Sequence, residues 1–402
     1  MKTIMILGAS ILQLPAIKKA KEMGLNVVVV DMNPNAIGFK EKNIEKEVIS
    51  TIDIPAVLKA AKRHKIDGIM TLASDMPMRT VAAVAKEMDL IGIDQETAIK
   101  ATNKAKMREI LKKHAVPIPM YFNVSSKEDF FNAVNKIKKA GYKCIIKPVD
   151  NSGSRGIDLL KNFDDKTIYE AYTYSKRFSQ SGDLMVEEFM EGPEVSVETL
   201  TIDGICHVIQ ITDKITTGAP YFVEMGHSQP SQFTNDIKEK IKMVAIAANK
   251  AIGIKNGPSH TEIKITEDGP KIVEIGARLG GDNIATHLIP LSTGIDMVEC
   301  CIKITLGETF NLEKKISKGA AIKYFNQCEG FIKKIEGIEE ASKLKGVQQI
   351  GIVHGIGENI SEINNSGSRM GFVIAQGSNC DEAKIICEKA ISKIKITIGD
   401  KI

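Results

Sequence analysis

The stretch Ile272-Val273-Glu274-Ile275-Gly276-Ala277-Arg278 sets one carboxylate and, four residues later, one guanidinium in an otherwise apolar segment. Glu262 lies in a similar segment upstream, residues 259–266, and the turn Glu267-Asp268-Gly269-Pro270 predicts a hairpin between the two. On adjacent antiparallel strands, Glu262 and Glu274 would project onto one face at similar heights. Because unpaired charges are rarely buried, this pair indicates a hard cation such as magnesium, bridged by phosphate oxygens.

Arg278 is followed by Leu279-Gly280-Gly281-Asp282, so a fixed guanidinium fork stands beside glycines that allow a ligand to approach the backbone closely. A guanidinium near a bound metal can stabilise the charge that builds on a transferring phosphoryl group or on an acyl phosphate. The simpler interpretation, a surface salt bridge between Arg278 and one of the two glutamates, stays open because exposed pairs of this kind are common and weak.

The composition is that of a globular protein with several domains. The chain has 402 residues, of which 43% are hydrophobic and 26% charged, and this length predicts two to four compact units. The 54 basic and 50 acidic residues are spread along the chain and leave a net charge of +4, so no basic stripe indicates a nucleic acid partner.

Three features predict a cytoplasmic protein. No apolar run approaches the ~18 residues that cross a bilayer, so we expect no membrane partner. The apolar start, residues 3–7, is followed by Gln13 and Pro15 and by no cleavage site, which favours a buried strand over a signal peptide. The seven cysteines are odd in number and lack Cys-x-x-Cys spacing, which indicates reduced thiols, mostly in the core.

The first third of the chain predicts an α/β domain over residues 1–95. Apolar runs at residues 3–7, 27–30, 66–72 and 90–92 alternate with helical periodicity, as in a parallel sheet covered on both faces. The segment from Gly8 to Gln13 has one glycine where a dinucleotide site needs three, so an ordinary turn or a modest substrate contact is the better interpretation.

A polar helix, residues 94–114, ends at Pro117 and Pro119 and predicts a linker over residues 96–116. A small α+β lobe follows at residues 117–191. In this lobe Lys147 ends a strand and precedes a loop, residues 148–156, whose Gly153 and Ser154 could cover phosphates. The loop lacks the Gly-Lys-Ser/Thr of a Walker motif, and a flexible hairpin is the alternative interpretation.

Residues 187–194, Glu-Glu-Phe-Met-Glu-Gly-Pro-Glu, join an apolar strand to a predicted hinge between two lobes. The carboxylates and backbone groups there could take the adenine amino group and the ribose hydroxyls, or the segment could be a solvated turn. The large lobe, residues 192–402, would then include a β-rich C-terminal subdomain. The pentapeptide Asn-Ser-Gly-Ser-Arg occurs at residues 151–155 and again at 365–369, where we interpret it as a turn.

The order of these parts resembles the ATP-grasp superfamily, and within it the carboxylate-amine ligases, which include L-amino acid ligases, glycinamide ribonucleotide synthetase and halves of carbamoyl-phosphate synthetase. The resemblance spans nearly the whole chain. It implies an α/β and α+β multidomain protein, with an N-terminal Rossmann-like domain before a two-lobed ATP-grasp fold. The positions that carry it, in chain order, are Lys104, Lys147, Glu187, Glu194, Glu262, Glu274 and Arg278.

The resemblance also implies roles for individual residues. Lys104 and Lys147 would contact the ATP phosphates, with Gly153 and Ser154 closing over them. Glu187, Glu188 and Phe189 would hold adenine, and Glu194 would take the ribose. Glu262 and Glu274 would bind magnesium, with manganese as a substitute, although Gly276 stands where many members carry an asparagine ligand.

The substrate pocket is implied less directly. Residues 221–230 contain a Glu-x-x-His pair, Glu224 and His227, that resembles the substrate segment of L-amino acid ligases. Glu224 could hold an ammonium group and His227 could act as a catalytic acid, base or dipole, although a lone loop histidine is more often structural. By strand alternation His260 should face the same side as Glu262, and Gly280 and Gly281 complete the predicted substrate-binding set.

These residues lead to the hypothesis of a ligase that uses magnesium-ATP to phosphorylate a small carboxylate, which an amine then attacks to form an amide or peptide bond. Two alternatives remain. One is a phosphoribosylglycinamide synthetase, or an enzyme that uses bicarbonate or formate. The other, of a different class, is a nucleotide-binding regulator without catalysis. Dimers are common in the family, so the resemblance allows a homodimer.

Overall fold

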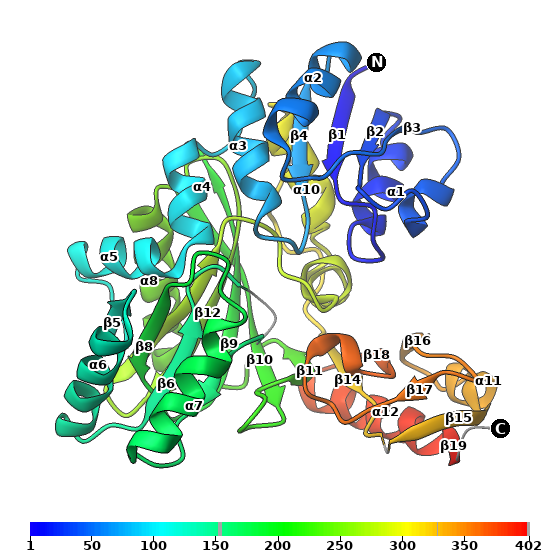
Figure 1. The fold of residues 1–402 in the computed structure, drawn as a ribbon. Helices are drawn as coiled ribbons and strands as arrows, with labels where there is room; N and C mark the ends of the chain where they lie inside the picture. Colours follow the sequence, from blue (N-terminus) through cyan, green and yellow to red (C-terminus); the bar gives the residue numbers. More distant parts are fainter. Residues whose placement is uncertain (152–154, 328, 400–402) are drawn as a thin grey trace.

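The computed structural model describes residues 1–151, 155–327 and 329–399, and these residues form four sheets (Figure 1). Gly153 and Ser154, predicted to cover phosphates, lie outside the described residues. The N-terminal region, the small lobe and the C-terminal region surround one large central sheet.

The N-terminal sheet is parallel, with the order β3-β2-β1-β4 and the bounds Glu45–Glu47, Asn26–Val30, Thr3–Leu7 and Gly68–Thr71. Its helices are α1 (Leu14–Glu22), α2 (Ile54–His64) and α3 (Pro77–Glu87). Alternate residues of β1 enter two different cores: Met5 and Leu7 lie in one, Ile4 and Ile6 in the other. The prediction of a parallel sheet buried on both faces is therefore confirmed.

Two details of this region differ from the prediction. Residues 90–92 form a bend and not a strand, and the fourth strand is the charged edge strand β3. An edge strand pairs on one side only and needs no apolar run, so hydropathy does not reveal it. The predicted linker helix is two helices, α4 (Gln95–Thr102) and α5 (Lys104–Lys113), because Asn103 is extended and caps α5 through the backbone N–H of Lys106.

The small lobe is an antiparallel sheet, β5-β8-β6-β7, with the bounds Tyr121–Val124, Leu184–Glu188, Cys144–Pro148 and Asp158–Leu159. Two helices, α6 (Lys127–Lys139) and α7 (Asp165–Lys176), pack on it around Phe130 and Ile168. Lys147, which the sequence predicts to end a strand, is the last residue but one of β6.

The central sheet has eight antiparallel strands in the order β13-β12-β9-β10-β11-β14-β18-β16. Their bounds are Gly269–Gly276, Gly257–Thr266, Glu194–Ile202, Ile205–Thr216, Glu224–Gln229, Gly319–Tyr324, Gly371–Gly377 and Val347–Ile352. The long helix α8 (Asn235–Ile252) packs on β10, β12 and β13. Because β11 pairs with β14, the sheet continues without a break from the large lobe into the C-terminal region.

The C-terminal region adds a second, three-stranded sheet and two helices. The sheet order is β17-β15-β19, with the bounds Asn359–Ile360, Gly330–Glu336 and Lys395–Gly399, and the helices are α11 (Ile338–Ser342) and α12 (Cys380–Lys393). The second Asn-Ser-Gly-Ser-Arg copy contains a one-turn 3-10 helix, η3 (Ser366–Ser368), which agrees with the predicted turn.

Residues far apart in sequence close the N-terminal sheet. Helix α10 (Met297–Thr305) packs against α1 and β4, and its Ile302 shares a core with Ile6. It follows a short π-helical segment, η2 (Ile284–Leu288), and α9 (Ile289–Thr293). We propose the domain boundaries as predicted; those at 116 and 191 fall between elements.

Two expectations from the composition can be compared with the structure. No helix in the described part of the chain is long and apolar enough to cross a membrane. The described cysteines are free thiols, and all but Cys206 are buried: Cys144, Cys300, Cys301, Cys380 and Cys387.

Gly192, in the predicted hinge, gives a test of this fold. Its φ of +129° belongs to a region that only glycine adopts readily, and an added Cβ would overlap the carbonyl oxygen of Ile265. We expect Gly192→Ala to lower the free energy of unfolding by about 3 kcal/mol in chemical denaturation followed by circular dichroism. Gly204→Ala is the control: φ is +80° there but no atom lies within 4 Å, so only about 1 kcal/mol should be lost. Equal losses would contradict the close approach.

Candidate active site

A β-bulge places the two predicted metal-binding carboxylates. Glu262 of β12 pairs directly with Glu274 of β13, and the register shifts at the next pair, Ile263 with Ile272. Val273 is therefore the extra residue, and Ile272 and Ile275 both enter the core although they are three residues apart. Without the bulge, Glu274 and Ile272 would share a face, so the bulge turns Glu274 into the cavity while its neighbours stay buried.

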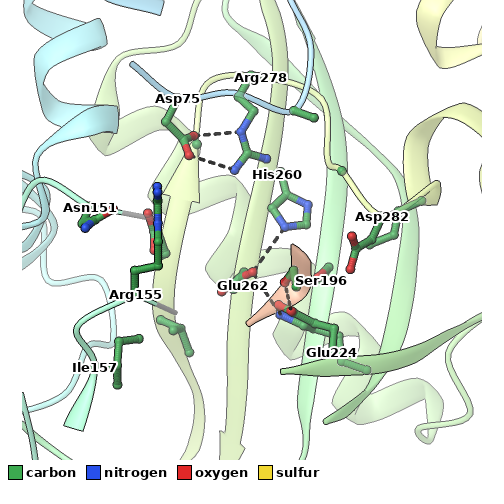
Figure 2. A pocket seen from close by; sticks show the side chains of 18 of the residues that line it. Asp75, Asn151, Arg155, Ile157, Ser196, Glu224, His260, Glu262, Arg278 and Asp282 are labelled. Atoms are coloured by element: carbon green, nitrogen blue, oxygen red, sulfur yellow. Dashed lines mark hydrogen bonds and ion pairs between the residues drawn. The ribbon is translucent and has the colours of Figure 1, made fainter. Parts of the chain in front are cut away.

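Both glutamates line a cavity of about 310 Å³ that is bounded by the N-terminal region, the small lobe and the central sheet (Figure 2). Most of the predicted site residues that are described line it: Lys104, Lys147, Glu224, His227, His260, Glu262, Glu274, Arg278 and Gly281. Residues to which the sequence analysis gave no role also line it, among them Asp75, Arg155, Ser196, Lys214, Asp282 and Ser366.

Each of the paired glutamates is neutralised by a lysine ammonium. Lys104 Nζ lies 2.9 Å from Glu274 Oε1, and Lys214 Nζ lies 2.9 Å from Glu262 Oε1. Burial lowers the pKa of Lys214, but the carboxylates of Glu194, Glu262 and Glu224 raise it well above its ordinary value. Burial likewise raises the pKa of Glu262, yet the Lys214 ammonium holds it well below its usual range. The Glu262 carboxylate is therefore ionised, as a metal ligand must be.

The donor set fits magnesium with an incomplete protein shell. Two carboxylates lie side by side facing one cavity, and oxygen ligands are what this ion prefers. Among the described residues, no group of three or more His, Cys, Asp or Glu side chains is placed to hold a metal. The site therefore suits an ion that keeps water or phosphate oxygens in its remaining positions.

Arg278 forms a salt bridge with Asp75 and not with Glu262 or Glu274, so the simpler interpretation of this arginine is wrong. Its Nε donates to Asp75 Oδ1 at 2.8 Å and its Nη2 to Asp75 Oδ2 at 3.2 Å, as Figure 2 shows. Asp75 follows β4 of the N-terminal sheet, so a carboxylate about 200 residues away fixes the guanidinium. A Cβ on Gly276 would lie 3.0 Å from Asp75 Oδ1, so a side chain at this position would press on the carboxylate that holds Arg278.

His260 belongs to the same face, as strand alternation predicts. Its Nε2 lies 3.5 Å from Glu262 Oε1, and its Nδ1 forms a short contact with Glu198. Burial lowers the pKa of His260, but the Glu198 carboxylate raises it to about 9, so the imidazole carries a proton. Glu198 also accepts a hydrogen bond from the backbone N–H of Gly280, where a Cβ would collide with it.

Glu187 does not line the cavity. It is completely buried, and its two oxygens face Arg108 Nε at 2.5 Å and Lys147 Nζ at 2.8 Å. Burial raises its pKa, but the two cations outweigh this effect and lower it to about 2. Arg108 also donates to the carbonyl oxygen of Val273, the bulge residue, at 2.7 Å. Glu187 thus fixes Lys147 at the cavity wall.

The other residues of the predicted hinge are also held by partners. Glu188 accepts from the backbone N–H of Met120 at 2.9 Å and pairs with Lys271 at 3.0 Å. The Phe189 ring lies 5.6 Å from that of Phe222. Glu194 lies 2.6 Å from Lys214, so the proposed ribose residue and a metal-site glutamate share one ammonium.

The predicted substrate residues Glu224 and His227 lie on β11 and also line the cavity. Glu224 Oε1 lies 3.6 Å from Lys214, and Glu224 Oε2 accepts from Ser366 Oγ at 3.3 Å. His227 Nε2 lies 3.3 Å from Asp282 Oδ2, which Arg369 also holds. Within the described residues, the buried His227 Nδ1 has no hydrogen-bond partner.

Sequence reasoning missed Lys214, Asp75 and Arg369 for different reasons. Asp75 stands just past the carboxyl end of a parallel strand, where ligands of open α/β sheets bind, and this position could have identified it. Lys214 is a cation in a long strand rich in apolar residues, which is a weaker signal. For Arg369 the only signal was the repeated pentapeptide, which we interpreted as a turn.

Comparisons with known proteins agree with this architecture. The family described as "ATP-grasp domain" matches residues 140–286, and "L-amino acid ligase C-terminal domain 2" matches residues 324–399. The chain is 25% identical to the uncharacterized protein y4rH of Sinorhizobium fredii, over 95% of this chain and 80% of that one. It is 24% identical to phosphoribosylamine–glycine ligase of Methanococcus maripaludis, over 94% and 90%. It is 26% identical to alanine–anticapsin ligase of Bacillus subtilis, over 71% and 63%.

Solved structures have the same fold. The L-amino acid ligase of Bacillus licheniformis superposes with a TM-score of 0.84 and 23% identity, over 100% of this chain and 99% of that one. The phosphoribosylglycinamide synthetase of Anaerococcus prevotii gives 0.79 and 22%, over 99% and 100%. The predicted fold class is thus confirmed.

The pairing of the buried Glu187 with Arg108 and Lys147 can be tested by its effect on stability. We expect Glu187→Gln to lower the free energy of unfolding at pH 7 by about 3 kcal/mol, because Arg108 and Lys147 lose their buried counter-charge. Because the pKa of Glu187 is lower in the folded state than in the unfolded state, its ionised carboxylate stabilises the fold at pH values above 4.5, the unfolded value. This stabilisation is lost as the pH falls toward 2, the folded value. The difference between wild type and variant should therefore shrink below pH 4.5 in denaturant titrations.

Glu191→Gln is the control, since Glu191 and its partner Lys143 have side chains 66% and 64% exposed. Such a pair contributes little at any pH. A loss at Glu187 that stays constant down to pH 3 would contradict the assignment of a strongly lowered pKa.

Proposed function

We propose that this chain, which carries an ATP-grasp domain, is an ATP-dependent carbon-nitrogen ligase that activates a small carboxylate as an acyl phosphate and couples it to an amine. The products would be ADP, phosphate and an amide or peptide bond. One observation carries the proposal: a single cavity brings together the paired carboxylates Glu262 and Glu274, the lysines Lys104 and Lys147, and the held guanidinium of Arg278.

The nucleotide would lie between the small lobe and the central sheet. Lys104 and Lys147 would contact its phosphates, and the loop with Gly153 and Ser154 would cover them. Glu187, Glu188 and Phe189 would border the adenine, with backbone groups making the contacts because the two carboxylates are engaged by cations. Glu194 would take the ribose.

Glu262 and Glu274 would hold magnesium, which supplies positive charge against the ATP phosphates. The ammonium groups of Lys214 and Lys104 now neutralise these carboxylates, so both lysines would be free to turn toward phosphate oxygens when the ion binds. The same cavity thus suits a nucleotide and a divalent cation together.

The carboxylate oxygen of the substrate would attack the γ-phosphorus, and ADP would leave. The amine nitrogen would then attack the carbonyl carbon of the acyl phosphate, and phosphate would leave as the amine loses a proton. Arg278, fixed by Asp75, would stabilise the phosphoryl oxygens in both steps. His227 is the candidate group to accept the proton, because its Nδ1 has no other partner in the described parts of the chain.

The residues around Glu224 favour an amino acid over a sugar phosphate as the substrate. Glu224 offers a carboxylate to an ammonium group, and the N-terminal region contributes Leu12, Ala73 and Asp75, none of which is basic. Lys19, one of the two lysines nearest the Gly8 to Gln13 loop, is paired with Glu22 and Asp296. We therefore favour amino acid ligation, and Gly280 and Gly281 would let the substrate lie close to the backbone.

A second candidate is a phosphoribosylglycinamide synthetase, because relatives with the name phosphoribosylamine–glycine ligase match 94% of this chain. A regulator that binds nucleotide without turnover is the alternative from another class. A cytoplasmic location and a homodimer stay predictions.

Phosphate release separates these functions. We expect release with magnesium-ATP and one or more single L-amino acids or pairs, accompanied by a dipeptide in mass spectrometry. Release only with glycine and phosphoribosylamine would establish the second candidate. No release with any acceptor, despite binding of ADP, would favour the regulator and contradict the proposal.

Glu274→Ala tests the metal assignment. Loss of one of two protein ligands should lower phosphate release by about 100-fold or more, because the phosphate charge would be poorly neutralised. The control is Glu267→Ala, an exposed glutamate in the turn of the same hairpin, which should keep wild-type activity. Activity that survives in Glu274→Ala would overturn the assignment.

A further inference from the structure

We propose that Ser366 and Arg369, in the C-terminal region, are positioning residues that build the ammonium-binding end of the substrate cavity. The proposal rests on the function proposed above and deepens it, since it assigns residues to the recognition of the amino acid substrate. The residues they position are Glu224, His227 and Asp282.

The repeated pentapeptide first draws attention to this region. Asn151 and Arg155, from the copy at residues 151–155, line the cavity on the side of the small lobe. Ser366, from the copy at residues 365–369, lines the same cavity from the C-terminal region. Residues from both copies thus line one cavity, although more than 200 positions separate the copies in the sequence.

Arg369 is buried and uses its whole guanidinium group. Nη1 and Nη2 donate to the two oxygens of Asp282 at 2.7 and 2.8 Å, and Nη1 also donates to the backbone carbonyl of Glu224 at 3.0 Å. Nε donates to the carbonyl of Ser366 at 2.9 Å, and the guanidinium lies 3.7 Å from the centre of the Tyr324 ring. A two-pronged pair of this kind fixes orientation as well as distance.

The backbone at Asp282 and Asn283, next to the Arg369 guanidinium, adopts an unfavourable conformation. Asp282 and Asn283 have φ values of +49° and +62°, so two consecutive residues other than glycine adopt the left-handed conformation. Such residues persist where the surroundings determine them, and they cluster at ligand sites. The Arg369 fork on Asp282 supplies this constraint next to Gly280 and Gly281.

Two side chains are positioned in consequence. His227 Nε2 lies 3.3 Å from Asp282, which sets the ring orientation and leaves its buried Nδ1 without a partner in the described structure. Glu224 is fixed twice, through its carbonyl by Arg369 and through its carboxylate by Ser366 Oγ at 3.3 Å. The cavity therefore presents the oriented carboxylate of Glu224, which suits an ammonium group, beside the fixed imidazole of His227, which also lines the cavity.

The test uses the 402-residue chain and four variants of it, Ser366→Ala, Ser366→Thr, Arg369→Gln and Arg369→Lys. The probes are common L-amino acids, each titrated by thermal shift in the presence of magnesium-ADP, with Kd for ADP measured separately. KM for the amino acid, KM for ATP and kcat follow for any amino acid that supports phosphate release.

We expect Arg369→Gln to weaken amino acid binding about tenfold or more and Ser366→Ala by a smaller factor, while the affinity for ADP stays within about twofold. Ser366→Thr keeps the hydroxyl and should restore binding, and Arg369→Lys keeps the charge without the fork and should restore it in part. A role in folding alone would not separate amino acid affinity from ADP affinity in this way.

Ser368→Ala is the matched control, because its hydroxyl lies in the same turn but contacts Asn364 outside the cavity. If Arg369→Gln does not fold, the Ser366 pair decides the result. The proposal is overturned if no amino acid stabilises the wild type, if Ser366→Ala binds as well as Ser368→Ala, or if ADP affinity falls equally. A wild type that binds amino acids without releasing phosphate would contradict the proposed function alone.

Discussion

Glu187 is the point at which three parts of the molecule meet. Its carboxylate, in β8 of the small lobe, lies between Lys147 of the neighbouring strand and Arg108 of the linker helix α5. Arg108 in turn holds the carbonyl of Val273, the residue that the bulge adds. A charge buried this deeply is tolerated only when fully partnered, so the position of the small lobe, the lysine at the cavity wall and the projection of Glu274 depend on one carboxylate.

The sequence was most informative where a local pattern determines the structure. Strand alternation and the Gly269-Pro270 turn were sufficient to predict the hairpin and the shared face of Glu262 and His260, whereas the projection of Glu274 into the cavity also depends on the bulge. The alternation of apolar runs with helical periodicity was likewise sufficient to predict the parallel N-terminal sheet, except that its fourth strand is the charged edge strand β3 and not residues 90–92. The resemblance to ATP-grasp ligases then gave the order of the domains, which no local pattern contains.

The side-chain pairings and the bulge depend on contacts between distant segments, and these contacts cannot be predicted from a single sequence. The pairing of Arg278 with Asp75 spans 203 positions, and that of Arg369 with Asp282 spans 87. The bulge at Val273 was also invisible, because an inserted residue is defined only against its partner strand. Glu187 was expected at the adenine, but two cations occupy its oxygens, and a strand sequence does not reveal which cations are near.

The unbroken central sheet has a consequence for how such chains evolve. The C-terminal region supplies β14, which covers the outer edge of β11, the strand that carries Glu224 and His227. An ancestor that lost or exchanged this region would expose a row of unpaired amides beside its own substrate pocket and would tend to associate with other chains. A region that replaces the C-terminal one therefore keeps the protein soluble only if it supplies a strand that pairs with β11. Such a replacement would also change the residues that line the substrate pocket on that side.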